Sequence, residues 1–190
     1  MDNFIEIIMS DTPSIQIKEN EEFMFSMIPF FRRCKGFDQK NKWHPYDVYE
    51  HTLKVIDNVD KDLVLRLAAL FHDIGKPSSY KEESGQGRFP GHWLTSTMIF
   101  GGFAKQNGID EDIQRRVSDL IYYHDYDFSS LTDEDIDTIK ERLSKDEVDD
   151  LFKLKRADLT AQNLDFSKRI IDDLDRQEEA LLSYYDVNIK

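Results

Sequence analysis

The residues best suited to chemistry are an adjacent imidazole and carboxylate, His72 and Asp73. They follow the run 63–71, which is apolar around nearly its whole circumference and therefore predicts a buried helix. Gly75 is expected to take the left-handed conformation just past the end of this helix, and Pro77 prevents its continuation. Burying an ionisable pair there is costly unless both groups are paired or bind a cation. A metal ion would satisfy both groups at once.

Further histidines and an aspartate lie on apolar helical faces elsewhere in the chain. His51 shares a face with Val48 and Val55, so its side chain is expected to point inward. The same reasoning applies to three residues of later segments: His92, His124 and Asp158. One inward histidine alone is more often a hydrogen-bonded core residue than a ligand. The full set, taken with the adjacent pair, favours a metal site over several unrelated buried polar groups.

The side-chain types of this set limit the choice of metal. Imidazole and carboxylate ligands without cysteine suit Mn²⁺, Fe²⁺, Co²⁺, Ni²⁺ or Zn²⁺, and Mg²⁺ stays open as well. Elsewhere in the chain, the acidic residues of the run 133–137 are spaced like those at the start of a calcium-binding loop. Thr138 stands where that loop needs glycine and Ser144 where it needs glutamate, so the calcium interpretation fails. These acids instead suit the first turn of a helix.

Helical periodicity dominates the chain, so we expect an all-α fold. Residues 1–17 predict a short helix or an irregular arm, and only residues 15–17 hint at a strand. Residues 78–91 are rich in Gly, Ser and Pro and predict a long mobile loop of the kind that often covers active sites. Capping residues predict where helices begin: Tyr46 or Asp47, Asp110, Thr132 with Asp135, Ser144 with Glu147, and Ser167.

Length and composition indicate one soluble globular domain. A chain of 190 residues, 39% hydrophobic and 33% charged, can bury a substantial core. No stretch is long and apolar enough to span a bilayer, and the first residues do not form a secretion signal, so we expect a cytoplasmic protein without membrane partners. Cys34 is the single cysteine and cannot form an internal disulfide.

The formal net charge of −13 opposes nonspecific binding of nucleic acid, because a polyanion is repelled before contact. A nucleic-acid ligand would have to be held locally. Basic residues gather in two groups near the candidate ligands, although ordinary surface solvation explains some of them equally well: Lys76, Lys81 and Arg88, and Lys153, Lys155 and Arg156.

His51, the His72-Asp73 pair and Asp158 follow one another as in the HD-domain superfamily of metal-dependent phosphohydrolases, which the sequence resembles. More specifically, five motifs are similar to the HD region of bacterial CCA-adding and poly(A)-polymerase-type tRNA nucleotidyltransferases: residues 36–39 (GFDQ), 44–53 (HPYDVYEHTL), 72–77 (HDIGKP), 89–92 (FPGH) and 156–158 (RAD). The likeness covers residues 36–164. The first 35 residues cannot hold a Gly-Ser turn and paired catalytic carboxylates on a sheet, so we expect no nucleotide addition.

The resemblance implies a single-domain helical bundle of the HD-domain type. We expect an N-terminal helical arm at residues 1–35, the HD domain at 36–165 and a C-terminal helix of the same domain at 166–190.

The resemblance also implies roles for individual residues. One metal ion would be bound by four side chains: His51, His72, Asp73 and Asp158. Asp73 could bridge to a second ion held by His92 and His124, so one or two ions are expected. Lys76 is expected to contact phosphate oxygens, and so is Arg88 from the mobile loop. We expect Asp73, as a metal ligand, and Lys76, as a phosphate contact, to be the catalytic residues. Asp125 is a candidate for orienting His124 or another ligand, and an exposed acid is an equally good interpretation of it.

The expected function is hydrolysis of a phosphomonoester or phosphodiester of a nucleotide or related compound by metal-activated water. The expected partner is a small phosphorylated substrate such as a nucleotide, and an RNA end stays open. Guanosine tetraphosphate, deoxynucleoside triphosphates and dinucleotides also stay open. Two alternatives are a noncatalytic module that binds a nucleotide or RNA end, and an interaction domain whose His and Asp side chains are only structural. The intact ligand set favours catalysis.

Overall fold

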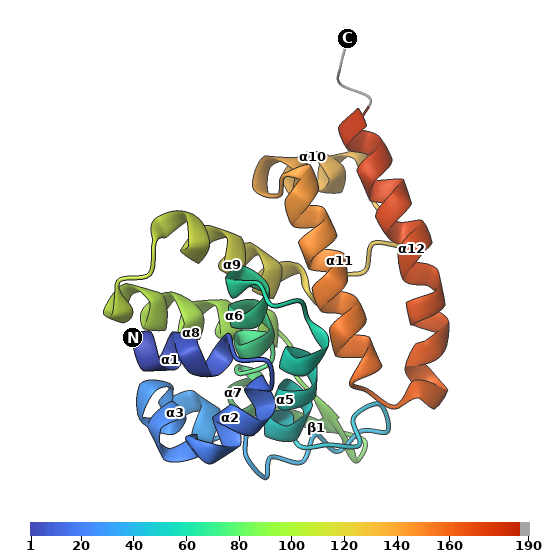
Figure 1. Cartoon of the computed structure of the whole chain (residues 1–190). Helices are drawn as coiled ribbons and strands as arrows, with labels where there is room; N and C mark the ends of the chain where they lie inside the picture. Colours follow the sequence, from blue (N-terminus) through green and yellow to red (C-terminus); the bar gives the residue numbers. More distant parts are fainter. Residues whose placement is uncertain (187–190) are drawn as a thin grey trace.

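The computed structural model describes residues 1–186, which form an all-α bundle (Figure 1). The predicted fold class is therefore confirmed. The described residues also contain one short antiparallel hairpin, made of β1 (Lys81–Glu83) and β2 (Gln86–Arg88), inside the segment predicted to be a loop. Ser84 and Gly85 connect the strands with φ of 53° and 76°, and two successive positive φ values suit a tight hairpin turn.

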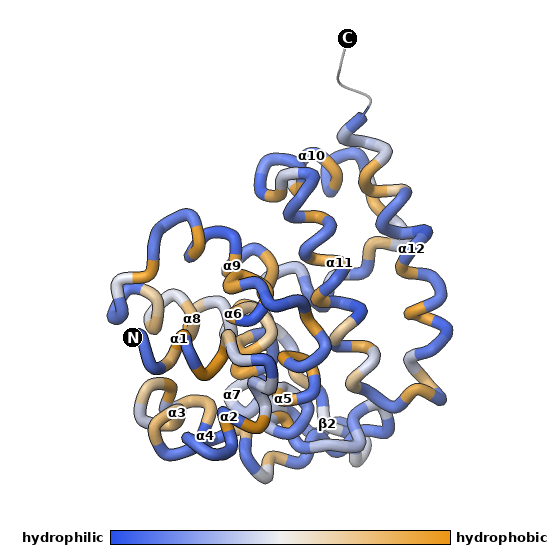
Figure 2. The backbone as a smooth tube through the Cα atoms, viewed as in Figure 1, coloured by the Kyte–Doolittle hydropathy of each residue, from blue (hydrophilic) through white to orange (hydrophobic). Residues whose placement is uncertain are grey.

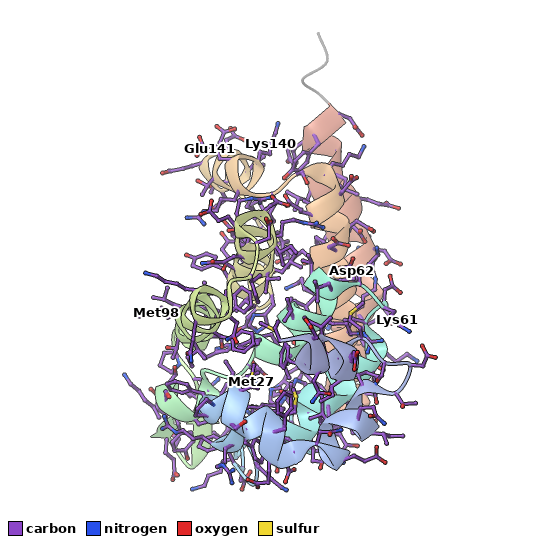
Figure 3. The ribbon with its side chains drawn as sticks, turned by 60° about the vertical axis from the view of Figure 1, so that its left-hand side comes forward. Met27, Lys61, Asp62, Met98, Lys140 and Glu141 are labelled. Carbon is purple, nitrogen blue, oxygen red and sulfur yellow. The ribbon has the colours of Figure 1, made fainter. Side chains whose placement is uncertain are left out.

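Helix α6 (Leu63–Phe71) lies inside the bundle and is buried from Val64 onward, as predicted. Asp62 caps its first turn by accepting hydrogen bonds from the backbone N–H groups of Val64 and Leu65 (Figure 3). Four helices pack against α6: α5 (Val48–Asn58), α8 (His92–Asn107), α9 (Glu111–Tyr123) and α11 (Lys145–Thr160). The residues that follow α6 are thus delivered to the middle of the molecule.

The chain leaves α6 differently from the prediction. Gly75 has φ of −78°, a right-handed conformation, so the expected left-handed residue is wrong. Glycine is needed there for space, because a Cβ atom would lie 2.6 Å from the carbonyl oxygen of His92 and 2.8 Å from the backbone nitrogen of Ser96. Pro77 lies in the first turn of the short helix α7 (Lys76–Ser79), where its missing N–H has no helical partner to lose.

The N-terminal segment forms four short helices: α1 (Asp2–Ile8), α2 (Pro13–Glu19), α3 (Glu21–Met27) and α4 (Pro29–Arg32). The strand hinted at by residues 15–17 is wrong, because these residues lie inside α2. Ile17 is fully buried there, so packing prevails over the strand preference of isoleucine. Met27 of α3 and Met98 of α8 are labelled in Figure 3. Both line an open, mostly apolar groove of 570 Å³.

Helix α12 (Leu164–Asp186) packs along α11 (Figure 1). The predicted cap at Ser167 is wrong, because the helix already begins at Leu164 and Ser167 is buried within it. Asn163 takes the capping role by accepting a hydrogen bond from the backbone N–H of Asp165, and asparagine is as good a cap as serine. The C-terminal part of the predicted helix, residues 187–190, lies outside the described residues.

The other predicted helix starts are confirmed. Asp47 caps α5 and Asp110 caps α9, and reciprocal capping boxes open α10 (Asp133–Arg142) and α11: Thr132 with Asp135, and Ser144 with Glu147. Hydrophobic residues recur at intervals among hydrophilic ones along α11 and α12 (Figure 2), as expected of amphipathic helices that pack one face against the bundle. Within residues 1–186, none of the helices combines the length and apolar character needed to cross a bilayer.

Candidate metal centre

Six side chains that are far apart in the sequence converge on one point of the bundle. They come from five helices and their ends: His51 of α5, His72 and Asp73 just after α6, His92 at the start of α8, His124 at the end of α9, and Asp158 of α11. All except Asp158 are at most 5% exposed. The sequence predicts each of these side chains to point inward, and the structure brings all six together.

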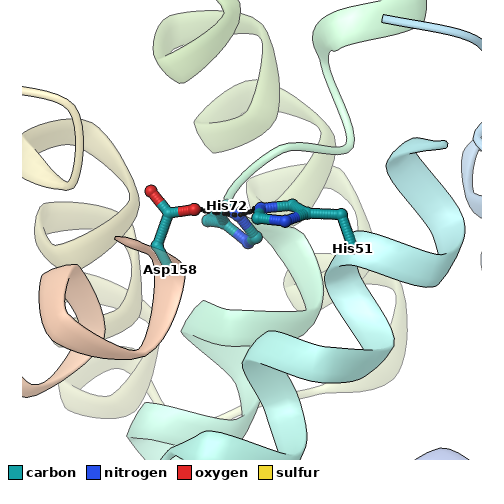
Figure 4. A group of neighbouring side chains, drawn as sticks. All are labelled: His51, His72 and Asp158. Carbon is teal, nitrogen blue, oxygen red and sulfur yellow. Dashed lines mark hydrogen bonds and ion pairs between the residues drawn. The ribbon is translucent and has the colours of Figure 1, made fainter. Parts of the chain in front are cut away.

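Three of these side chains form what we call the first group: His51, His72 and Asp158 (Figure 4). The Nε2 atoms of His51 and His72 are 3.3 Å apart. Oδ1 of Asp158 lies 2.9 Å from Nε2 of His51 and 3.9 Å from Nε2 of His72. One potential ligand atom of each residue thus points into the same small space.

The second group consists of Asp73, His92 and His124. Its two imidazoles also meet at Nε2, at 3.3 Å, and Oδ1 of Asp73 lies 3.3 Å from His92 and 3.6 Å from His124. The other oxygen of Asp73, Oδ2, lies 3.3 Å from Nε2 of His72 and 3.5 Å from Nε2 of His51. The Asp73 carboxylate therefore stands between the two groups and presents one oxygen to each.

This arrangement of lone pairs fits a cation. Three of the four imidazoles use Nδ1 to donate to a backbone carbonyl oxygen, at 2.7–3.0 Å: His72, His92 and His124. A neutral ring held in this way presents a lone pair at Nε2. Yet the Nε2 atoms meet in pairs, and Oδ1 of Asp73 is buried without a hydrogen-bond partner among the described residues. Divalent metal ions bound between these atoms would satisfy the lone pairs together.

Charges at the centre also keep both carboxylates ionised. Burial alone would raise the pKa of Asp73, but the Lys76 ammonium and the His72 imidazole outweigh it and hold that pKa well below its usual range. Burial would also raise the pKa of Asp158, but its hydrogen bond with His51 and the electrostatic attraction of His51 and His72 together outweigh burial and lower that pKa. Burial lowers the pKa of His124 and so favours its neutral form. Ionised carboxylates and neutral imidazoles are the forms that bind metals.

Lys76 is held tightly beside the centre. Its Nζ lies 2.6 Å from Oδ2 of Asp73 and donates to Oε1 of Gln39 at 2.9 Å. Gln39 is fully buried. Helical periodicity could not predict that it binds Lys76, because Gln39 belongs to a loop. Gly87 of β2 packs directly on this loop: its N–H donates to the Lys40 carbonyl oxygen at 3.0 Å, and a Cβ atom would lie 2.1 Å from the Gln39 carbonyl oxygen. The hairpin therefore supports the loop that holds Lys76.

Arg88 lies at the end of β2 and is exposed. It lines a 190 Å³ cavity over the candidate ligands, together with Lys76 and His92. Lys81, on the exposed strand β1, does not line this cavity. Asp125 lines it and is exposed, but Nδ1 of His124 bonds to the backbone, so the predicted orienting contact is not formed.

The second predicted basic group does not offer free charges to a ligand. Nζ of Lys155 is buried and donates to the backbone carbonyl oxygens of His124 and Tyr126, at 2.8 Å each. Burial lowers the pKa of Lys155 to about 8. Lys153 and Arg156 form ion pairs with nearby acidic side chains. Lys155 thus ties α11 to the end of α9, where His124 lies.

His44 is a site residue that periodicity could not single out, because it lies on a loop. Its ring centroid is 5.3 Å from that of His51, and the residue lines the 190 Å³ cavity and a larger neighbouring one. Its Nδ1 is buried without a hydrogen-bond partner among the described residues. Burial and the nearby Lys76 charge lower its pKa to about 3, so the ring is neutral. The one signal for it in the sequence is its place in the motif of residues 44–53.

Comparison with known proteins agrees with this geometry. The family described as "HD domain" matches residues 43–179. The chain belongs to the HD domain family. This confirms the resemblance seen in the sequence and places the protein in a superfamily of metal-dependent phosphohydrolases. The match runs past residue 165 into α12, and the predicted division at residues 35 and 165 stays a prediction.

Two curated relatives share part of this HD domain. An A-adding tRNA nucleotidyltransferase of Deinococcus radiodurans is 36% identical over 72 residues, which cover 34% of this chain and 16% of the relative. A bifunctional uridylyltransferase/uridylyl-removing enzyme of Thiobacillus denitrificans is 31% identical over 119 residues, which cover 51% of this chain and 13% of the relative. The HD domain thus corresponds to a small part of either relative.

Proposed function

We propose that this HD domain is a metal-dependent phosphohydrolase that hydrolyses a phosphomonoester or phosphodiester of a nucleotide or related compound. The observation that carries the proposal is the position of the Asp73 carboxylate, with Oδ2 toward the first group and Oδ1 toward the second. A carboxylate placed in this way suits a bridging ligand between two ions. The imidazoles of each group would then supply further ligands to one ion.

A bound divalent metal ion would act as a Lewis acid: it would lower the pKa of water toward 7 and neutralise phosphate charge. The candidate ions are Mn²⁺, Fe²⁺, Co²⁺, Ni²⁺, Zn²⁺ and Mg²⁺. The protein supplies the rest. Lys76 would bring its ammonium to a phosphate oxygen, and Arg88 would reach the same phosphate from the hairpin. Because Asp73 and Lys76 are buried, their charges act in a poorly screened environment.

The relatives suggest which substrates to test first. The name of one describes removal of uridylyl groups, and the name of the other describes addition of A to tRNA. Nucleotides are therefore the first class, and an RNA end is the second. The formal net charge of −13 favours a small ligand over a long polyanion.

The test begins with elemental analysis of the purified protein, followed by a screen of divalent metals against nucleoside phosphates, cyclic nucleotides, dinucleotides and guanosine tetraphosphate. We expect a copurifying transition metal and a phosphatase or phosphodiesterase activity. His72→Ala and Asp73→Asn should lower that activity by at least about a hundredfold, because each removes a ligand. Asp172→Asn, at an exposed acid of α12, is the control and should keep full activity. Full activity in metal-stripped protein would reject the proposal.

A second candidate is a noncatalytic module that binds a nucleotide or RNA end. The observation in its favour is that one relative is named only as a nucleotidyltransferase. This alternative predicts tight binding of a nucleotide or RNA end without turnover under every metal in the screen.

A further inference from the structure

A cavity of 580 Å³, which we call the α12 cleft, adjoins the candidate metal centre. Its walls come from the loop of Trp43 and His44, the loop after α9, and the facing sides of α11 and α12. It shares five lining residues with the 190 Å³ cavity over the candidate ligands: His44, His124, Asp125, Asp158 and Gln162. A molecule whose phosphate lies over the ligands can therefore extend into the α12 cleft.

The two cavities differ in what they can hold. The smaller one, 190 Å³, is somewhat larger than the ~150 Å³ cavity that holds a benzene molecule, so a phosphate group fits there with room to spare. The α12 cleft, at 580 Å³, falls in the range of about 300–1,000 Å³ that is usual for small organic ligands. The α12 cleft is thus the larger of the two spaces for the organic group of an ester whose phosphate lies over the ligands. A phosphate ester with one nucleoside-sized group matches this division of space.

The charged groups of the α12 cleft do not provide for a second phosphate. The Lys155 ammonium is occupied by two backbone carbonyl oxygens, and Arg176 forms an ion pair with Asp173. The charged side chains of the lining that remain, apart from the candidate ligand Asp158, are one cation and two carboxylates: Arg169, Asp125 and Asp127. A further phosphate would therefore meet more negative than positive free charge.

The uncharged part of the wall suits a nucleoside. The Trp43 ring packs on Phe166, with centroids 5.4 Å apart, and the Trp43 carbonyl oxygen accepts a hydrogen bond from the Asn163 N–H at 2.8 Å. The indole is thus held in place beside the apolar side chains of α11 and α12, where a planar base can stack. The amides of Gln162 and Gln177 and the carboxylates of the wall can bond to base edges and sugar hydroxyls.

We propose that the α12 cleft binds the uncharged nucleoside of a nucleoside monophosphate whose phosphate lies at the metal centre. The proposal rests on the proposed function and narrows its substrate class to mononucleotides. In the reaction the oxygen of a water molecule adds to phosphorus and the P–O bond to the sugar breaks. The sugar oxygen takes the proton that the water loses, which leaves a nucleoside and inorganic phosphate.

Binding is tested by calorimetry with the common ribonucleosides and deoxyribonucleosides and their 5′-mono-, di- and triphosphates. At least one nucleoside should bind, its monophosphate should bind more tightly, and further phosphates should not improve affinity. Trp43→Ala should weaken nucleoside binding by about tenfold, because stacking on an aromatic ring is lost. Trp43→Phe keeps a stacking surface and should retain most of the affinity.

Two neighbouring acids of α12 provide a matched test of the charge argument. Asp173 lines the cleft, whereas Asp172 is exposed and lines none of the cavities described above. Asp173→Lys adds positive charge to the cleft and should reduce the preference for mono- over diphosphates by about five- to tenfold. Asp172→Lys makes the same change of charge outside the cleft and should leave the preference unchanged.

Hydrolysis separates this proposal from the one it rests on. Release of phosphate from p-nitrophenyl phosphate, without binding of any nucleoside, would keep the phosphohydrolase and reject the nucleoside cleft. Tighter binding of diphosphates, triphosphates or an oligonucleotide than of monophosphates would also reject it. Nucleoside binding without turnover of any phosphate ester would instead reject the proposed function.

Discussion

The chemistry of the candidate centre depends on one residue more than on any other. Asp73 faces four imidazoles and the Lys76 ammonium while it is 1% exposed. A carboxylate so deeply buried needs compensating positive charge, which the Lys76 ammonium supplies in part and a cation bound by the imidazoles would complete. Three of these neighbours come from other helices, α5, α8 and α9, so small displacements of the backbone are felt at this point.

Gly75 controls one such displacement. Gly75→Ala should lower the free energy of unfolding by about 1–3 kcal/mol, because its Cβ atom must push away the backbone of His92 and Ser96. The same shift moves His92 and should weaken metal binding. Urea unfolding and a metal titration measure the two effects. Gly102→Ala is the control: its Cβ atom would meet nothing within 4 Å, so the variant should be more stable by about 0.5–1 kcal/mol. Equal effects at both glycines would contradict the steric explanation.

At the scale of elements, the centre depends on how helix ends are joined. Lys155 of α11 donates to the carbonyl oxygen of His124, the C-cap of α9, and to that of Tyr126 in the loop that follows. The hydrogen bond that Lys76 donates to Oε1 of Gln39 similarly joins α7 to the loop before α5, and the ion pair of Lys76 with Asp73 joins α7 to the end of α6. These polar contacts fix the ends of elements whose middles are held by apolar packing.

The buried Lys155 should give a pH dependence of stability with a definite sign. Its pKa is about 8 in the folded protein and 10.5 when it is exposed, so between these values the unfolded chain binds more protons. Stability therefore rises as pH increases through this window, and the full difference corresponds to about 3 kcal/mol. The measurement is the difference in free energy of unfolding between the wild type and Lys155→Met, in which the effects of all other titrating groups cancel. This difference should shift in favour of the wild type between pH 8 and 10. A constant difference between the two proteins would show that the ammonium is not desolvated.

At the scale of the whole molecule, the two groups exist only in the folded chain. Their ligands come from α5, α8, α9, α11 and the end of α6, so the unfolded chain cannot present them together. Anything that binds the two groups must therefore stabilise the fold.

Metal addition should raise the midpoint of thermal unfolding. A free metal concentration one hundred times the dissociation constant adds about 2.7 kcal/mol to the free energy of unfolding. His51→Ala should reduce this gain, and Asp172→Asn should not. The gain should shrink as pH falls, because protons compete for the imidazoles and the Asp73 charge raises the pKa of His72 despite burial. A metal-induced shift that is the same at low pH would contradict binding by imidazole.

The sequence allowed much of the candidate centre to be predicted. The apolar stripes around His51 and His124, and the apolar run before His72, each show which way a helix turns its ligand. By contrast, His44 and Gln39 lie in a loop, where no period links side-chain direction to position. The hairpin was also missed, because its strands have three residues each and their sequences, KEE and QGR, show no alternation of apolar and polar side chains.

By itself, the sequence determined the all-α class, the helix starts at Asp47 and Asp110, and the inward direction of each ligand, because caps and periodicity are local properties. Tertiary structure alone decided that the ligands meet, that Asp73 divides its oxygens between two pairs of imidazoles, and that a cleft opens beside them toward α12. Those facts depend on the angles and distances at which separate helices pack, and no local pattern encodes these directly.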